Sequence, residues 1–504
     1  MQGEEKQYET VIGLEVHVEL STKTKIFCGC STRFGAPPNT QTCPVCTGMP
    51  GSLPVLNRQV VEYALALGLA LHCEVNRYCR FDRKNYFYPD NPQNYQISQL
   101  YLPVCYDGEV EIALAGEQEE KREGNGNGAP AGAAGTGRKK KIRIHELHME
   151  EDAGKLVHEE NGDCSLVDYN RSGVPLIEIV SEPDMRNAEE AIAYLEKLCM
   201  LCRYLGISDG KLQEGSLRAD VNLSVREAGS GTLGTRTEMK NLNSFRAVSR
   251  AVAEERRRQI ALLKEGKKVV QETRRWDDTK GGSYPIRSKE DAEDYRYFPE
   301  PDVPPVVISR EWTDEIRSRL PEFKEEKEER YQKEFGLSAY DAGVLTQSRH
   351  LAELFEKTAV LCGNPKKAAN WFMGEVLRLL KERGREPEEL WFSPEHLAAL
   401  IKAAEQGKIN QANAQKVFAE IVERDVEPLS YMKEQGLETL SDEGALRLAA
   451  EEVLAGNPGL VAEFRAGKEK VFGFFVGQVM KKTKGMADPG KVNELLRQLL
   501  GKTE

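Results

Sequence analysis

Apolar and polar residues alternate in three short stretches of the chain, 10–20, 217–225 and 235–240, which predicts three β-strands. In each strand the apolar side chains face one side and the polar side chains face the other. The polar members are Glu15, His17, Glu19, Arg218, Asp220, Asn222, Arg236, Glu238 and Lys240. If the strands share a sheet, one face collects carboxylates, an imidazole and several cations. An antiparallel sheet with an ordinary solvated face has the same pattern, so the alternation alone leaves both interpretations open.

Two further strands and three helices are predicted in the first 300 residues. The stretch 142–155 is a predicted strand, and the largely apolar run 174–180 is a predicted buried strand. The polar residues of 142–155 include His145, His148, Glu150, Glu151 and Asp152. Helical periodicity predicts helices at 57–72, 187–205 and 244–263.

The pattern changes to helices from about residue 308, with no convincing strand beyond it. We therefore predict an α+β protein in three parts. An antiparallel sheet forms a catalytic cradle at 1–300, followed by an all-helical domain at 301–407 and a helical tail domain at 408–504. Within the first part, the polar and aromatic segment 81–99 contains two prolines and is predicted to be a long functional or structural loop.

Residues 116–140 differ from the rest of the chain in composition. Charged residues give way to a run rich in glycine and alanine and then to Arg138, Lys139 and Lys140, without a large apolar side chain. Such a segment cannot bury enough apolar surface to fold, so we predict a disordered insertion. Its glycines do not predict a phosphate-binding loop, because no apolar strand precedes them and no capped helix follows.

Composition excludes several classes of protein. The 504 residues are 40% hydrophobic and 30% charged, which is typical of a globular protein. No run of about 18 apolar residues predicts a membrane span, and no secretory signal opens the chain. An odd number of cysteines, eleven, is expected of a reducing compartment such as the cytoplasm. The net charge of −11 still permits a nucleic-acid partner, because a local basic patch is sufficient for binding.

Four of the cysteines have the spacing of a metal site. A Cys-x-Cys pair is followed after twelve residues by a Cys-x-x-Cys pair, and the four are Cys28, Cys30, Cys43 and Cys46. Four thiolates on two short turns suit tetrahedral zinc, and a site closed by four protein ligands is structural. Four reduced cysteines in a core are the alternative.

The polar face has the residues of a magnesium and phosphate site. Carboxylates hold the cation, and Arg and Lys contact phosphoryl oxygens. A nucleotide site here would not be a P-loop, because GxxxxGK[ST] is absent from the sequence.

Long motifs throughout the chain resemble one family. The runs GLEVHVEL, CPVC, FDRKNYFYPDNPQNYQISQ, HMEEDAGK, YNRSGVPLIEIVSEPD, EGSLRADVNLSV, TEMKNLNSF and DYRYFPEPDVPP resemble GatB, the B component of the aspartyl/glutamyl-tRNA(Asn/Gln) amidotransferases. Downstream, WFMGEVLRLLK and GKEKVFGFFVGQVMKKTKG resemble its helical and tail regions. The resemblance extends over nearly the whole chain.

The resemblance implies a ligase that repairs mischarged tRNA. In the family, ATP phosphorylates the side-chain carboxylate of Glu-tRNA(Gln) or Asp-tRNA(Asn), and ammonia then displaces phosphate to form the amide. The implied magnesium ligands, direct or through water, are Glu15, His17, Glu150 or Glu151, Asp220 and Glu238. We infer that Arg218, Asn222 and Lys240 contact phosphate or substrate. Strand parity does not choose between Glu150 and Glu151, because the alternation there is imperfect.

The resemblance also implies partners. A separate amidase hydrolyses glutamine, a small third protein wraps the other two to complete a heterotrimer, and ammonia arrives through a channel. The helical tail would contact tRNA through a basic cluster consisting of Arg465, Lys468, Lys470, Lys481, Lys482 and Lys484. The alternative hypothesis is a non-catalytic, zinc-stabilised scaffold that binds tRNA. Which mischarged tRNA is the substrate stays open.

Overall fold

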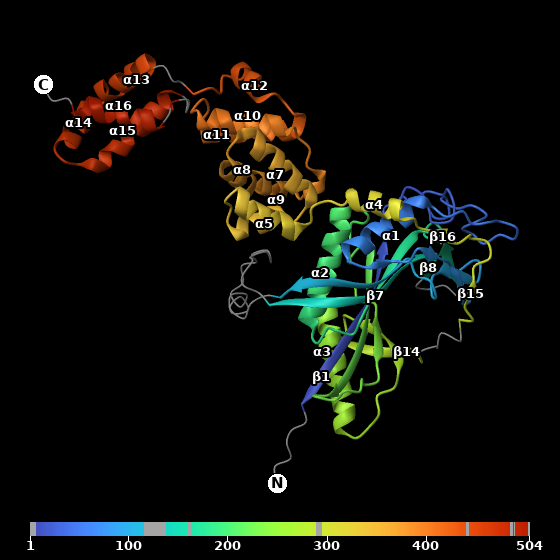
Figure 1. Cartoon of the computed structure of the whole chain (residues 1–504). Coiled ribbons are helices and arrows are strands. Elements are labelled where there is room, and N and C mark those ends of the chain that lie inside the picture. The colour runs from blue at the N-terminus through green and yellow to red at the C-terminus, as the bar shows by residue number, and fades with distance from the viewer. Residues whose placement is uncertain are drawn as a thin grey trace, which may run out of the picture. The chain divides into compact units, whose positions relative to one another are not determined.

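The chain forms two compact units, Met1–Phe323 and Lys324–Glu504 (Figure 1). The structure is a computed structural model and describes residues 7–114, 138–158, 164–288, 295–439, 443–483, 487 and 489–501. The first unit contains strands and helices, and the second is helical. The predicted α+β class, with a sheet followed by helices, is confirmed. The three-part division at 300 and 407 stays a prediction.

A nine-stranded sheet organises the first unit, in the order β14-β13-β12-β11-β1-β10-β7-β6-β2. Its strands are β1 (Tyr8–Glu19), β2 (Glu74–Val75), β6 (Cys105–Ala113), β7 (Lys139–Glu151), β10 (Pro175–Ser181), β11 (Leu217–Glu227), β12 (Thr237–Lys240), β13 (Glu272–Asp277) and β14 (Gly282–Ser288). Neighbouring strands are antiparallel except β12 and β13. The strand nearest the N-terminus, β1, therefore lies in the middle of the sheet between β10 and β11.

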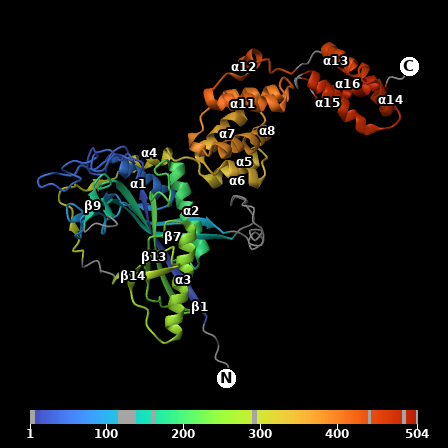
Figure 2. The same cartoon turned by 180° about the vertical axis from the view of Figure 1, so that it is seen from behind.

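Three helices cover the apolar face of this sheet: α1 (Arg58–Ala70), α2 (Ala188–Leu205) and α3 (Phe245–Lys264). The view from behind shows α2 and α3 along the strands (Figure 2). Asn187 caps α2 by accepting a hydrogen bond from the Glu190 amide, and Gly206 ends it with a left-handed backbone. Ile12, Leu14 and Val16 of β1 are fully buried in the core beneath. The opposite, polar face of the sheet is left for the candidate site.

Small sheets complete the first unit. A three-stranded sheet contains β4 (Asp82–Asn85), β5 (Tyr95–Ser98) and β15 (Phe298–Pro299), and two pairs combine β3 (Tyr78–Cys79) with β16 (Val306–Val307) and β8 (Lys155–His158) with β9 (Ser165–Asp168). The segment 81–99 is therefore not a loop throughout, and that prediction was wrong at its two ends. Antiparallel pairing supplies hydrogen bonds there that the local sequence does not reveal.

The predicted insertion at 116–140 lies mainly outside the described residues, but its last part does not. Lys139 and Lys140 begin β7, where they pair with Ala113 and Ile112 of β6, so the prediction of disorder was wrong for these two residues. The Lys140 Nζ also lies 2.7 Å from a carboxylate oxygen of Glu190 in α2. Pairing and this contact order a sequence that has no apolar side chain of its own.

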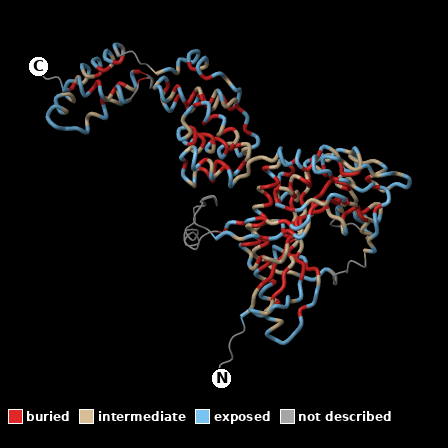
Figure 3. Tube along the Cα trace, viewed as in Figure 1, coloured by how far each residue is buried: buried red, intermediate tan, exposed pale blue. Residues whose placement is uncertain are grey.

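The second unit contains two separate apolar cores, one between Tyr331 and Met432 and one between Leu446 and Leu500. Its α-helices are α5 (Lys324–Glu334), α6 (Ala339–Leu345), α7 (Arg349–Cys362), α8 (Pro365–Trp371), α9 (Leu377–Arg383), α10 (Pro394–Glu405), α11 (Gln411–Arg424), α12 (Pro428–Glu434), α13 (Glu443–Ala455), α14 (Pro458–Arg465), α15 (Phe472–Lys482) and α16 (Pro489–Gly501). Buried residues recur along one side of each longer helix (Figure 3). Helix α4 (Arg310–Ser318) belongs to the first unit. No helix in the described part of the chain combines the length and apolar character of a membrane span.

Candidate functional site

The register of the sheet places the predicted polar residues next to one another. Glu15 on β1 is directly opposite Asp220 on β11, and His17 is opposite Arg218. On the other side of β1, His17 is opposite Glu178 of β10. Because side chains of paired residues on one face lie about 5 Å apart, the central strands bring these groups into reach of one another.

Two groups of potential metal ligands result. The first contains His17, Glu150 and Glu178, and the second contains Glu15, Asp220 and Glu238; within each group the ligand atoms lie within 4.8 Å of one another. Nε2 of His17 is 3.4 Å from a carboxylate oxygen of Glu150 and also 3.4 Å from one of Glu178. Carboxylates with one imidazole suit a hard divalent cation.

The pKa values of these groups are shifted because several charged side chains lie close together. Burial disfavours the imidazolium of His17, but Glu178 and Glu150 outweigh burial and raise the pKa of His17 to about 9. Burial likewise opposes the charged form of Glu178, but the adjacent His17 and His148 hold the pKa of Glu178 well below its usual range. Burial, followed by the nearby Glu178 and Glu238, raises the pKa of Glu15. The negative charges at this face thus require cationic partners.

Lys240 and Asn222 connect the second group. Lys240 Nζ is 2.5 Å from a carboxylate oxygen of Asp220 and 3.2 Å from one of Glu238. The Asn222 amide donates a hydrogen bond of 2.8 Å to Glu15. Although burial disfavours the ammonium, Asp220 and Glu238 raise the pKa of Lys240 above its ordinary value.

Arg218 lies opposite His17 on β11, and its Nη2 donates a hydrogen bond of 2.7 Å to Asp152. Arg236 is exposed and precedes β12.

Glu150 and Glu151 point in different directions. Glu150 lies beside His17, whereas Glu151 accepts hydrogen bonds from the Gln93 side chain at 2.5 Å and the Ile97 amide at 3.0 Å. Burial raises the pKa of Glu151 to about 8. Glu151 lines a cavity of about 240 Å³ that also borders Cys46. Only Glu150 of the pair therefore belongs to a ligand group found among the described residues.

Sequence reasoning missed Glu178 on the face and also Lys84, which lies on β4 of the three-stranded sheet. Glu178 is the one charged residue in the apolar run 174–180, and this isolation was a signal that it serves a purpose other than solvation. Lys84 of β4 was hidden in the polar-aromatic segment, where its Nζ lies 5.2 Å from the centre of the Tyr295 ring. Burial alone would lower the pKa of Lys84, but Tyr297, Glu150 and Glu178 raise it.

The four predicted cysteines converge beside this unit's sheet. Cys28, Cys30, Cys43 and Cys46 place their sulfur atoms within 4.8 Å of one another, so the cluster can hold a metal ion. The Sγ atoms of Cys43 and Cys46 are 3.9 Å apart, close to the roughly 3.8 Å edge of a tetrahedron with 2.3 Å zinc–sulfur bonds. A hydrogen bond from Cys28 outweighs burial and, with the Cys43 amide and Lys25, lowers the pKa of Cys46 to about 4. The local chemistry therefore favours a thiolate.

Comparison with known proteins identifies the family. A model of the GatB/GatE catalytic domain matches residues 10–314, and a model of the GatB domain matches residues 353–500. The chain belongs to the GatB family. It is 59% identical over 495 residues to a protein of Agathobacter rectalis named as the B component of an aspartyl/glutamyl-tRNA(Asn/Gln) amidotransferase, covering 98% of this chain and all of that protein. Proteins of the same name from Lachnospira eligens and Lachnoclostridium phytofermentans are 59% and 56% identical, over 98% and 99% of this chain and all of theirs.

The matched GatB domain includes the lysines predicted to contact tRNA. Lys468, Lys470, Lys481 and Lys482 are exposed, and Lys484 lies outside the described residues. Lys468 pairs with Glu463 at 3.1 Å, and Lys482 pairs with Glu452. Two of the predicted contacts thus already have acidic neighbours, which lowers the local positive charge.

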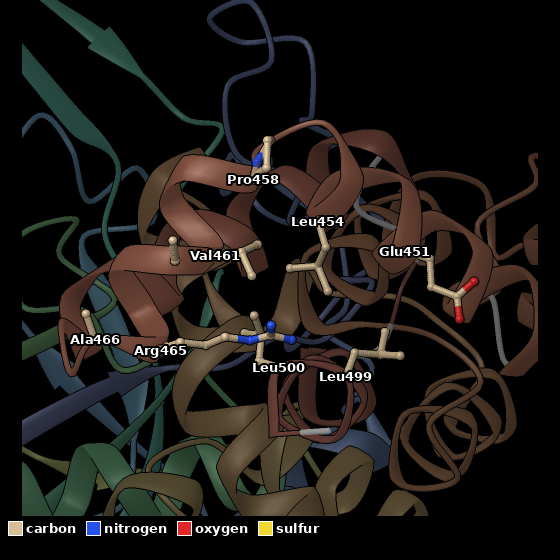
Figure 4. Close-up of a pocket in the computed structure, with 9 residues that line it drawn as sticks. Glu451, Leu454, Pro458, Val461, Arg465, Ala466, Leu499 and Leu500 are labelled. Carbon is tan, nitrogen blue, oxygen red and sulfur yellow. The ribbon is translucent and has the colours of Figure 1, made fainter. Parts of the chain in front are cut away.

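A groove of about 790 Å³ in the same GatB domain is formed by α13, α14 and α16. Leu454, Val461 and Leu499 face one another across it, and the Arg465 side chain extends beside Leu500 (Figure 4). Arg465 is the only residue of the predicted basic cluster among the groove's described lining residues. The groove and the exposed lysines are therefore largely different surfaces.

Proposed function

We propose that the polar sheet face activates the side-chain carboxylate of mischarged Glu-tRNA(Gln), Asp-tRNA(Asn) or both with ATP, and that ammonia then converts it to the amide. The single observation that carries this proposal is the juxtaposition, on one face of a GatB-family catalytic domain, of two carboxylate ligand groups, one of which includes an imidazole, with the ammonium of Lys240. The names of the relatives, which specify an aspartyl/glutamyl-tRNA amidotransferase, support it.

The reaction needs charge compensation more than it needs a nucleophile from the protein. A carboxylate is a poor acyl donor, and phosphorylation supplies it with a leaving group. The attacking carboxylate and the γ-phosphate are both anionic, so their approach is favoured only where positive charge is already in place. Magnesium, when bound, would neutralise phosphate charge and orient the nucleotide.

The proposed magnesium ligands are the two ligand groups, with Glu178 added to Glu15, His17, Glu150, Asp220 and Glu238. Their oxygen-rich composition fits a hard cation. Glu151 fits this role less well, because it is hydrogen-bonded to Gln93 and Ile97 away from His17.

The protein's own cations have distinct proposed roles. Lys240 would stay positively charged between Asp220 and Glu238 and present an ammonium to a phosphoryl oxygen. Asn222 would orient Glu15 through its amide. Arg218, held by Asp152 at the edge of the face, would contact substrate or phosphate from there.

Zinc is the proposed metal of the four-cysteine cluster. All four positions would be occupied by protein thiolates, which leaves none for substrate, so its role would be structural.

The relatives' names describe one component of an amidotransferase, which supports a multi-protein complex. The separate partners are inferred from the family resemblance: an amidase would hydrolyse glutamine and deliver ammonia, and a small third protein would complete the heterotrimer. Exposed tail lysines would contact tRNA phosphates.

The test is ADP formation by the reconstituted heterotrimer, with and without mischarged tRNA. We expect the charged tRNA to stimulate ATP turnover and glutamine to yield the amidated tRNA. Glu15→Gln should lower tRNA-dependent ADP formation by about 100-fold or more, because it removes a carboxylate from the second ligand group.

Glu9→Gln is the matched control, since Glu9 lies on the same strand and pairs with Arg186 and Arg226 instead. Normal ADP formation by Glu15→Gln and by His17→Ala, with tRNA binding intact, would reject the magnesium assignment. Absence of stimulation by either mischarged tRNA would favour the non-catalytic scaffold.

A further inference from the structure

The Lys25 side chain is fully buried beside the four-cysteine cluster. It lies in the segment between β1 and Cys28 and has no exposed surface. Its ammonium is 3.4 Å from Sγ of Cys46 and donates a hydrogen bond of 3.1 Å to the carbonyl oxygen of Tyr169.

The surroundings of this ammonium lack the usual counter-ion. Burying a charged ammonium costs free energy unless an opposite charge or several hydrogen bonds compensate for it. Within the part of the chain that the structure describes, no carboxylate forms an ion pair with Lys25. Glu151 borders the same cavity but instead accepts hydrogen bonds from Gln93 and Ile97. The compensating negative charge must therefore come from the sulfur side.

A thiolate at Cys46 supplies one negative charge next to this ammonium, and a metal-bound cluster supplies a net charge of about two. A divalent zinc with four thiolates carries a formal charge of about −2. Sγ of Cys46 already faces two donors, the Cys43 amide at 3.2 Å and the Lys25 ammonium. Hydrogen-bond donors to a metal ligand orient that ligand and stabilise its charge.

We propose that Lys25 is the counter-ion and hydrogen-bond donor of the metal–thiolate centre and slows loss of its metal. This inference rests on the proposed zinc site and adds a residue that the cysteine spacing does not include. Lys25 is a positioning residue, because it would act on the metal through Cys46.

The same ammonium connects the centre to the segment 169–173. Besides the contact with Tyr169, Ser172 Oγ donates a hydrogen bond of 2.9 Å to the Cys46 carbonyl. At Gly173 the left-handed backbone (φ +81°) brings the chain so close that an added Cβ would lie 3.5 Å from both Cys46 and Lys25. Arg171 of this segment reaches Asp152, the partner of Arg218, so the metal centre also supports one edge of the polar face.

Zinc release from the full-length chain in its complex tests the proposal. Zinc content is first measured in the wild type purified under reducing conditions, and release into excess chelator is then followed for the wild type and Lys25→Met. We expect Lys25→Met to release zinc about 10- to 100-fold faster. Lys25→Arg, which keeps the charge but changes its geometry, should fall between the two.

Lys23→Met is the matched control, because Lys23 is an exposed lysine two residues away. It should release zinc at the wild-type rate. Equal release rates for folded Lys25→Met and Lys23→Met would overturn the role of Lys25. If Lys25→Met does not fold, Lys25→Arg is compared with Lys23→Arg in the same way, and equal rates for that pair would be equally decisive.

Cobalt substitution separates this role from simple packing. A donor to thiolate sulfur lowers the energy of its lone pairs, so its removal should shift the sulfur-to-cobalt charge-transfer bands of Lys25→Met to longer wavelength. The bands should not move in Lys23→Met. An unshifted spectrum in Lys25→Met would contradict a direct contact with the centre. A wild type without about one zinc per chain would instead reject the zinc site itself.

Discussion

The four-cysteine cluster and the polar sheet face are both candidate metal sites, but the chain builds them differently. The cluster takes all its ligands from two turns within the short stretch 28–46. The polar face takes its candidate ligands from β1, β7, β10, β11 and β12, and these residues extend from Glu15 to Glu238. One site depends on local spacing, and the other depends on the register of five strands.

We therefore expect the two sites to lose their function in different ways. A local cluster can lose its metal while the distant strands keep their pairing. A face built by register depends on every strand that contributes to it, because a slip of one residue turns a side chain to the opposite face. Four predictions test that contrast, in order of decreasing expected effect.

The largest effect is expected at Glu178, which tests whether register defines the face. Glu178→Gln removes a carboxylate 3.4 Å from His17, so tRNA-dependent ADP formation should fall by about 100-fold or more. Zinc content should stay unchanged. Glu182→Gln, just beyond β10 and paired with exposed His145, is the control and should keep activity. Equal activity of the two variants would mean that the face needs only the residues that alternation predicts.

The cysteine cluster should respond with loss of metal and stability. Cys43→Ser removes one thiolate of four, so we expect zinc content to fall well below one per chain and the Tm to drop by about 5–10 °C. Metal analysis and thermal unfolding measure both. Cys164→Ser, at an exposed cysteine outside the cluster, should change neither. Retention of zinc by Cys43→Ser would contradict a four-thiolate site.

A smaller effect is expected at Glu255. It lies on the helix-covered side of the sheet and contacts β12, the strand that carries Glu238 and Lys240. This carboxylate on α3 is fully buried and accepts hydrogen bonds from Thr237, next to Glu238, and from Gln259 and Arg258. Burial opposes its charge, but these donors hold the pKa of Glu255 below its usual value. Glu255→Gln should cost about 2 kcal/mol at pH 7 and lower the Tm.

The pH dependence gives the sign of the Glu255 contribution. Because its pKa is lower in the folded state, this contribution is present above the unfolded pKa of about 4.3 and is lost as pH falls through the folded value. The Tm difference between wild type and Glu255→Gln should therefore shrink between about pH 5 and pH 3. A constant difference across that range would indicate packing rather than charge. Glu254→Gln, at the neighbouring position on α3, provides the control.

The smallest effect is expected from removing residues 115–137. The Leu114 amide donates a hydrogen bond of 3.0 Å to the Arg138 carbonyl, so β6 and β7 meet where the segment leaves them. In the deletion variant a two-residue Asn-Gly turn replaces residues 115–137, because such a turn can close a hairpin between two antiparallel strands. We expect transamidation, zinc content and Tm to stay close to the wild type. A large loss of transamidation would give the insertion a function that neither site explains.

Several elements could be predicted because their determinants are local. Alternation on β1 and β11 identified the polar residues, and Asn187 with Gly206 set the ends of α2. Proline marks two further helix starts, because Pro428 and Pro458 begin α12 and α14. The strands at the ends of 81–99 also escaped prediction, because their partners include Phe298 and Pro299, distant in the chain.

The sequence by itself determined the spacing of the four cysteines, the alternation of the polar strands and the family to which the chain belongs. Only the tertiary structure decided that Glu150 rather than Glu151 lies beside His17, that Glu178 lies opposite His17, and that Lys25 lies against Cys46. The physical reason is that spacing and alternation are properties of one segment. Strand order, register and the burial of a lone charge depend on contacts between residues far apart in the chain.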